Sequence, residues 1–323
     1  MKMKLNILIG SILIIILSGS CIKNEFEDDE KEEQRLIEEF VQNNGLTDND
    51  RLESGVYVKI TENSGSSVYA EDNDYVIVNY IGKYTDDKVF DSNIEEVAIA
   101  SGFYIDTLVY GPTRLKVGST QIEGFNEAIK YIPEGSSALM LIPSEKAQKD
   151  YIPLVFEVEL FKVVTAIDTF EIEQMVDFLN EFEFGLTDTL TSGLFYRSDS
   201  SAVAPDAESV SSGDTLTLNI TGKFAETENY IDGVDQRTFF PLGMQTGTID
   251  DYVFGMPDVF PITTGVEMVI QTMKVGEVAE IVLHSNYGYG TGGYYNDILN
   301  IHIVPPYTPL YFTVELVDII KAE

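Results

Sequence analysis

The stretch that decides the fold is VGEVAEIVLHSNYGYGTGG, residues 275–293, continued by IHIVPPYTPLYFTVEL, residues 301–316. It holds a β-branched run at 278–283, a loop that alternates tyrosine and glycine, a pair of prolines, and a final run at 310–316. Apolar side chains at every second position are typical of strands with one buried face. The stretch therefore predicts two strands joined by a long, glycine-rich connection.

The same order of segments occurs earlier in the chain. LVFEVEL at 154–160 matches LYFTVEL at 310–316, and VNYIGKY at 78–84 matches LNITGKF at 218–224. Amphipathic helices are expected before each copy, with apolar stripes made by Leu36, Ile37, Phe40 and Val41, and by Ile172, Met175, Val176 and Leu179. Matched segments in one order predict a tandem repeat.

These ordered segments resemble the FKBP-type peptidyl-prolyl cis-trans isomerases. In the first copy, the pattern V-x-Y-x-G…F-D-S and the segment QIEGFNEAI at 121–129 carry the likeness. The resemblance implies catalytic residues at Tyr80, Phe90, Asp91, Ile122, Phe125 and Phe156. In the second copy, it implies a substrate-binding set made by Tyr289, Ile303, Val304 and Phe312.

Neither copy has the whole set that the resemblance implies. In the first, Ala147 stands at the loop tyrosine's position, no diproline flap follows, and Phe125 replaces the family's tryptophan. In the second, Ile220 replaces the strand tyrosine and Val266 replaces the floor aromatic. The first copy is thus expected to form the base of a proline pocket, and the second copy mainly the rim of a pocket of its own.

The predicted fold class is α+β, with two tandem FKBP-like domains. Each is an antiparallel sheet wrapped on a short helix and preceded by an amphipathic helix. The predicted segments are a lipoprotein signal peptide at 1–21, an acidic tether and leader helix at 22–53, a first domain at 54–164, a connecting helix at 165–191 and a second domain at 192–323. No clean periodicity is visible between residues 226 and 260, where loops and short strands are expected.

The chemistry of prolyl isomerisation suits these residue types. Rotation about the X–Pro bond breaks amide resonance, with a barrier of roughly 18–20 kcal/mol. An apolar aromatic pocket can favour the less polar twisted state without a nucleophile, metal or cofactor. The two histidines, His284 and His302, lack the spacing of a metal site. Proline-containing polypeptides are the expected partners.

The N-terminus has the features of an export signal. Lys2 and Lys4 precede an apolar run at 5–17, which is too short to span a membrane, and small residues lead to Cys21. This order resembles a bacterial lipobox, which implies lipidation of Cys21 and attachment to the membrane. The acidic run at 23–30 resembles signals of Bacteroides-like bacteria, so an outer-membrane lipoprotein is expected, facing the periplasm or the cell surface.

Composition narrows the function classes further. The formal net charge of −34 argues against nucleic acid as a partner, because phosphate binding needs lysine and arginine. Two rivals to an extracytoplasmic isomerase or folding factor remain. One is a catalytically inactive envelope protein that binds peptides or partners. The other is a glycan-binding surface lipoprotein, which the exposed pair Tyr294 and Tyr295 would serve.

Overall fold

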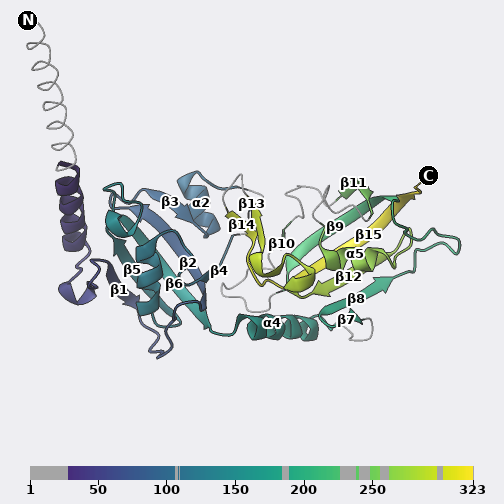
Figure 1. Cartoon of the computed structure of the whole chain (residues 1–323), viewed down its shortest axis with the longest axis horizontal. Coiled ribbons are helices and arrows are strands. Elements are labelled where there is room, and N and C mark those ends of the chain that lie inside the picture. Colours follow the sequence, from purple (N-terminus) through teal and green to yellow (C-terminus); the bar gives the residue numbers. More distant parts are fainter. Residues whose placement is uncertain are drawn as a thin grey trace, which may run out of the picture. The chain divides into compact units, whose positions relative to one another are not determined.

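The computed structural model describes residues 28–105, 108, 110–183, 189–225, 238–239, 248–254, 262–296 and 301–322 (Figure 1). Two compact units are present. The first runs to Ser101 and resumes from Leu115 to Val163, and the second contains Gly102–Arg114 and the chain from Val164 onward. Nothing in the sequence pattern indicated that residues 102–114, inside the predicted first domain, would group with the second unit.

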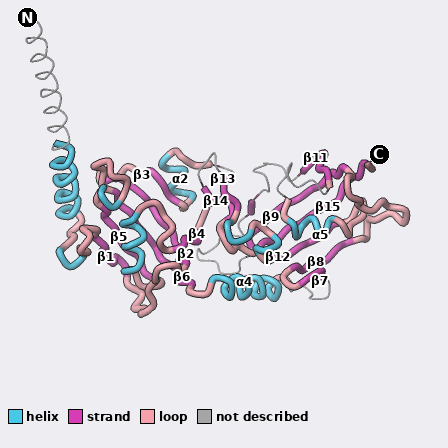
Figure 2. Tube along the Cα trace, viewed as in Figure 1, coloured by secondary structure: helices cyan, strands magenta, loops and turns pink. Residues whose placement is uncertain are grey.

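The first unit is built on a six-stranded antiparallel sheet, counted over the described residues. Its strands, in sheet order, are β1 (Tyr57–Glu62), β5 (Ser136–Ile142), β6 (Leu154–Val164), β2 (Tyr75–Tyr84) and β3 (Val89–Ser92). The short strand β4 (Thr113–Lys116) also pairs with β2, and the division between the units falls within it, after Arg114. Two short helices accompany it, α2 (Glu95–Ser101), which is labelled in Figure 2, and α3 (Glu123–Ala128).

The turn between β2 and β3 forms where the sequence places two aspartates. Asp87 has a φ of 67°, and the Asp86 carboxylate accepts a hydrogen bond from the Lys88 backbone N–H (3.2 Å). Aspartate tolerates this left-handed backbone and supplies the local hydrogen bond that closes a turn. The hairpin sets Asp91 opposite Gly82, which fixes the positions of the predicted site residues on β3.

The first sheet is covered on both faces. Phe125 and Ile129, from α3 and the turn after it, pack on the inner face with Met140 and Phe156. Residues 28–43 form the leader helix, and its Phe40 packs on the outer face against Leu141. Ile37 and Val41 of the predicted stripe pack against the same cluster, whereas Leu36 is not part of it. Burial of apolar area on both faces stabilises the sheet.

The second unit repeats this plan with more strands. Within the described residues, its sheet order is β10 (Thr238–Phe239), β9 (Thr215–Phe224), β15 (Leu310–Ile320), β12 (Val278–Leu283), β8 (Leu194–Asp199) and β7 (Thr189–Thr191), with β11 (Thr248–Val253) on β9. The helix α5 (Thr264–Ile270) packs on the inner face, and β13 (Tyr294–Asn296) pairs with β14 (Ile301–Val304) in a separate hairpin. The α+β fold of two antiparallel sheets is therefore as predicted.

The leader helix of the second unit, α4 (Ile167–Glu181), packs with a different face from the predicted one. Met175 and Leu179 are buried as expected, but Ile172 and Val176 are 48% and 45% exposed. Glu171 and Gln174 are buried in their place. The prediction failed because it counted apolar residues only, whereas both of these polar side chains accept hydrogen bonds that offset part of the cost of their burial.

Several predictions lie outside the described residues. They include the export signal, Cys21, and most of 226–260, although the short strands β10 and β11 do lie in that last region. Among the helices that the structure describes, none is both long and apolar enough to cross a membrane.

Candidate active site

An aromatic cluster occupies the inner face of the first sheet. Phe156 on β6 is its centre, with ring centroids 5.8 Å from Phe90, 5.2 Å from Phe125 and 6.4 Å from Tyr80. Phe90 and Phe125 meet Phe156 edge-on, a geometry that aromatic quadrupoles favour. Phe125 and Phe156 are buried, whereas Tyr80 and Phe90 are partly exposed. The structure thus brings together four of the six residues predicted for this copy.

Close approach of the backbone makes this cluster possible. A Cβ atom on Gly82 would lie 2.8 Å from two ring atoms of Phe90 and 3.0 Å from a ring atom of Phe156. Any larger residue at position 82 would therefore displace the rings, since such contacts are shorter than side chains tolerate. Gly82 is a residue of the site that the motif V-x-Y-x-G contains and that residue chemistry alone does not reveal.

Asp91 is the charged member of the site, and it contacts the cluster through Tyr80. The Tyr80 hydroxyl donates a hydrogen bond to Asp91 Oδ2 (2.9 Å). Burial and the neighbouring carboxylate raise the pKa of Tyr80, so the phenol stays protonated and remains a donor. Burial raises the pKa of Asp91, while hydrogen bonds from Tyr80 and the Ser92 backbone oppose that rise. The pair fixes the Tyr80 ring beside Phe156.

The remaining predicted residue of the first copy, Ile122, lies at the start of α3. Its carbonyl accepts hydrogen bonds from the backbone N–H groups of Phe125 and Asn126, and its side chain packs against the inner core. Ala147 also packs there, where a tyrosine would otherwise stand. Only residues 143–153 separate β5 from β6, so this copy has a short loop in place of a flap.

The second copy brings its predicted residues into one cluster but buries them. Ile303, Val304 and Phe312 are 3%, 1% and 1% exposed and belong to the core. Tyr289 packs against that core and stacks on Tyr294 with centroids 5.1 Å apart. Burial is the main reason why the pKa of Tyr289 is raised. In this structure, three of the four side chains therefore support the fold and offer little surface to a substrate.

The substitutions noted in the second copy are buried as well. Ile220 and Val266 are 3% and 0% exposed, and both join the cluster that contains Phe312. On the backbone, Phe239 pairs with Gly222, in the register that Asp91 has with Gly82 in the first copy. An aromatic residue thus takes the chain position of the carboxylate. The second copy has no equivalent of the Tyr80–Asp91 pair among the described residues.

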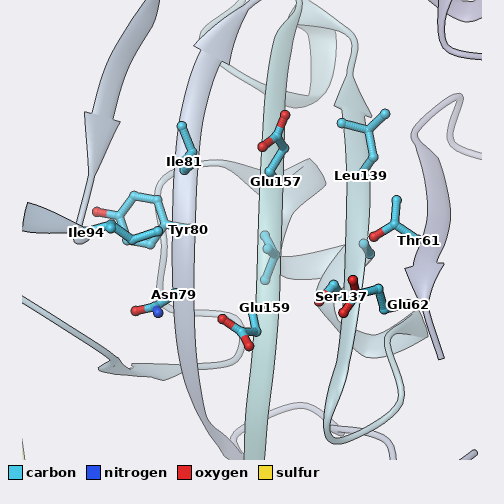
Figure 3. Close-up of a pocket in the computed structure, with 12 residues that line it drawn as sticks. Thr61, Glu62, Asn79, Tyr80, Ile81, Ile94, Ser137, Leu139, Glu157 and Glu159 are labelled. Carbon is cyan, nitrogen blue, oxygen red and sulfur yellow. The ribbon is translucent and has the colours of Figure 1, made fainter. Parts of the chain in front are cut away.

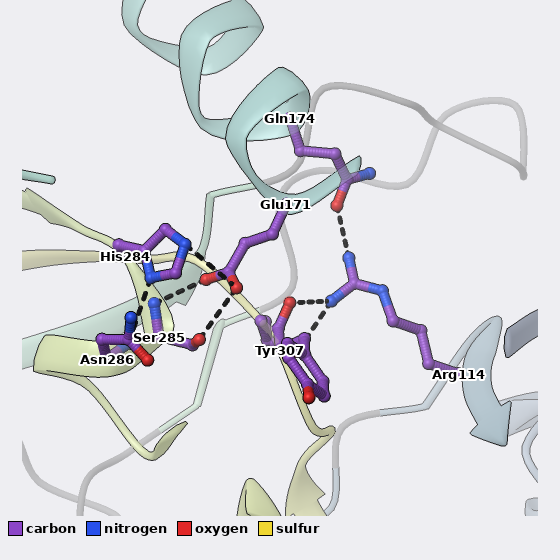
Figure 4. Close-up of polar contacts among 8 residues, drawn as sticks. Arg114, Glu171, Gln174, His284, Ser285, Asn286 and Tyr307 are labelled. Carbon is purple, nitrogen blue, oxygen red and sulfur yellow. Dashed lines mark hydrogen bonds and ion pairs between the residues drawn. The ribbon is translucent and has the colours of Figure 1, made fainter. Parts of the chain in front are cut away.

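Each leader helix is held by a polar contact that residue patterns did not predict. Glu171 of α4 accepts hydrogen bonds from the backbone N–H (2.5 Å) and hydroxyl (2.8 Å) of Ser285 and lies 3.4 Å from His284 Nε2 (Figure 4). In the first unit, Glu33 accepts from Ser144 N–H (2.7 Å) and its hydroxyl (2.8 Å) in the same way. Alignment of the two copies, residue by residue, would have revealed this repeated pair.

Arg114 makes a second polar centre within the second unit. It is 6% exposed and donates to the Tyr307 carbonyl (2.6 Å), the Thr308 hydroxyl (3.1 Å) and Gln174 (Figure 4). Its guanidinium also lies over the Phe170 ring, 5.3 Å from the centroid. Arg114 therefore joins α4 to the turn that follows the two prolines. The sequence showed an isolated arginine and no reason for its burial.

A sequence profile of the FKBP-type peptidyl-prolyl cis-trans isomerases matches residues 67–161 and 206–317, which is well over half of the chain. The chain belongs to this family. It therefore carries two FKBP domains, and FKBP isomerases act on proline-containing polypeptides.

Individual FKBP relatives match over shorter stretches. The short-type peptidyl-prolyl cis-trans isomerase of Methanocaldococcus jannaschii is 42% identical over 74 residues, covering 23% of this chain and 46% of that protein. FK506-binding protein 5 of Rhizopus delemar is 49% identical over 51 residues, covering 16% of this chain and 12% of that protein. The chain thus matches less than half the length of either curated relative.

Solved FKBP structures are also similar to this chain. The three FKBP domains of wheat FKBP73 align with a TM-score of 0.31 and 17% identity, over 84% of this chain and 97% of that one. FkpA from Escherichia coli aligns with a TM-score of 0.34 and 24% identity, over 51% of this chain and 73% of that one.

Proposed function

We propose that this FKBP protein is an exported, lipid-anchored prolyl isomerase that assists the folding of other exported polypeptides, with its activity in the first copy. The family supplies the reaction class. The export-signal pattern at residues 1–21 supports the compartment. The remaining question is which of the two copies can bind a proline ring.

The aromatic cluster of the first copy is the observation that carries this assignment. Tyr80 and Phe90 are partly exposed above the buried rings of Phe125 and Phe156, so a proline ring can lie on aromatic surface there. Such a surface desolvates the imide and favours its twisted, less polar state. The corresponding side chains of the second copy lie in its core.

Asp91→Ala is expected to lower the acceleration of proline-limited refolding about tenfold, since a hydrogen bond to a charged group contributes about 1.5–3 kcal/mol. The reason is that Tyr80 loses the acceptor that holds its ring against Phe156. Refolding of a protein whose slow phase is a prolyl isomerisation, followed by fluorescence, measures the effect. Tyr289→Phe in the second copy is the control and should leave the rate unchanged. A large loss of acceleration in that control would instead indicate that the active site lies in the second copy.

A catalytically inactive, peptide-binding protein is the second candidate. It is favoured by the short loop at 143–153, which leaves the first cluster without a flap, and by the buried rim of the second copy. In that case, the unsubstituted chain would not accelerate refolding, yet proline-containing peptides would still bind and Phe90→Ala would weaken their binding.

Cys21→Ala is expected to prevent lipidation, so the precursor should move from the detergent phase to the aqueous phase in a Triton X-114 partition. Bacterial expression of the full precursor provides the material. A single acyl chain binds membranes only marginally, so complete partition of the wild type would indicate more than one chain. Ser20→Ala, which keeps the cysteine and a small neighbour, is the matched control. Equal partition of Cys21→Ala and wild type would contradict lipidation.

The orientation of the lipoprotein needs a separate test. Protease added to whole cells would cleave the intact lipoprotein if it faces outward.

A further inference from the structure

The outer face of the first sheet is divided into two parts. Phe40 of the leader helix covers the part that contains Leu141 and Val155, and Leu139 of the same cluster lies at the border between the two parts. Beyond it, a cavity of about 510 Å³ lies over β1, β5, β6 and β2, and includes Glu62, Asn79, Leu139 and Glu159 in its lining (Figure 3). This cavity is on the opposite face of the sheet from the aromatic cluster, because Glu157 and Glu159 alternate with the core residues Phe156 and Val158 along β6.

The cavity has an excess of negative charge. Glu62 lies opposite Ser137, which in turn lies opposite Glu159. Of the three lining carboxylates, Glu157 is paired with Lys83 (2.7 Å). No ion pair among the described residues includes Glu62 or Glu159. Burial raises the pKa of Glu159, and the charge of Glu62 raises it further, against the hydrogen bond from Asn79.

A buried acceptor in the same lining lacks a donor. Asn79 is only 6% exposed, and its amide lowers the pKa of the nearby Glu159 carboxylate. Its oxygen, Oδ1, has no hydrogen-bond partner within the described part of the chain. Figure 3 shows the Asn79 and Glu159 side chains next to each other at this side of the cavity. An unmet buried acceptor is costly, so a bound donor would be stabilised there.

The second copy has the same two residue types at the matching positions, and there they are joined by a hydrogen bond. Asn219 donates to Glu315 (2.8 Å), and the Thr248 hydroxyl donates to Asn219 Oδ1 (2.8 Å). Thr313 takes the place of Glu157, and the cavity measures about 300 Å³. The Asn–Glu pair is thus a shared element of both copies, whereas the free acceptor and the larger, more acidic cavity are found in the first.

We propose that this outer-face cavity of the first copy binds a lysine or arginine side chain of a polypeptide. The apolar stem of such a side chain can lie on Ile81 and on the small exposed part of Leu139, while its cationic head meets Glu159 and Glu62. Charge-assisted hydrogen bonds to carboxylates are the strongest available to these acceptors. No group of three or more histidine, cysteine, aspartate or glutamate residues suited to a metal occurs in the described residues, which favours an organic cation. The site does not require the aromatic cluster to be catalytic.

The test uses the full chain and a short, proline-free peptide of alternating lysine and serine, blocked at both ends and labelled for fluorescence anisotropy. Without proline, the peptide does not report on the isomerase site. Glu159→Gln, which keeps an acceptor for Asn79, should weaken binding about tenfold, because one charge-assisted hydrogen bond is lost. Glu315→Gln removes the same charge from the Asn219–Glu315 pair of the second copy and should change binding less than about twofold, since it acts only through screened long-range attraction.

A peptide with glutamine in place of lysine should not bind, and Glu62→Gln should weaken binding of the lysine peptide as Glu159→Gln does. Equal losses in Glu159→Gln and Glu315→Gln would show that the peptide merely follows the net negative charge, which would overturn the site. Unchanged binding in Glu159→Gln would overturn it as well. Thermal unfolding of each variant checks that the exposed substitutions leave the fold intact.

Discussion

Replacing Phe156 with alanine is expected to lower the free energy of unfolding of the first unit by about 3–5 kcal/mol, as is usual for truncation of a buried aromatic. The same change should remove most of the acceleration of proline-limited refolding. Phe156 is 4% exposed and contacts the rings of Tyr80, Phe90 and Phe125, so its loss opens the floor of the site and frees its walls. Denaturant unfolding and the refolding assay measure the two effects.

The repeat supplies a matched control in Phe312. Phe156 pairs with Met140 on β5, and Phe312 pairs with Ile281 on β12, in the same register of the two sheets. Phe312→Ala should therefore destabilise the second unit by a similar amount, about 3–5 kcal/mol, and leave the isomerase rate unchanged. The milder Phe156→Leu keeps the first unit folded if alanine does not. If Phe312→Ala abolished catalysis while Phe156→Ala did not, the assignment of the site to the first copy would be wrong.

Glu171→Ala is expected to destabilise the second unit by about 3–5 kcal/mol, because it leaves two buried donors without their acceptor. The Glu171 side chain is fully buried and accepts from both the backbone N–H and the hydroxyl of Ser285. Its removal should also loosen α4 from the sheet, where Phe178 packs beside Val282. Hydrogen exchange of the α4 amides, together with denaturant unfolding, reports both changes.

Glu33→Ala is the comparison for this variant. It breaks the equivalent contact with Ser144, but Glu33 is only partly buried, so water can replace the lost acceptor. The expected loss is smaller, about 1 kcal/mol, and should appear in the first unit. If both variants have equal, small effects, the two contacts are incidental to helix docking. A large effect of Glu171→Ala with retained protection of α4 would show that the carboxylate stabilises the loop at Ser285 only.

The leader helices show how much of the structure apolar residue patterns can predict. Apolar spacing located both helices and identified Phe40, Met175 and Leu179 as buried. It assigned Ile172 and Val176 to the buried face of α4, where Glu171 and Gln174 lie instead. A count of apolar residues cannot include the free energy of a hydrogen bond whose partner is distant in the chain, such as Ser285 or Arg114.

The sequence alone determined the repeat, the α+β class and the family, because strand alternation and turn residues act over short distances and recur in both copies. It also identified the residues of the aromatic cluster, Tyr80, Phe90, Phe125 and Phe156. Only the tertiary structure decided that Ile303, Val304 and Phe312 are core, that Gly82 leaves room for two rings, and that Asn79 lacks a donor where Asn219 has one. Exposure and hydrogen-bond satisfaction depend on which distant segments pack together, and a local pattern of residue types does not contain that information.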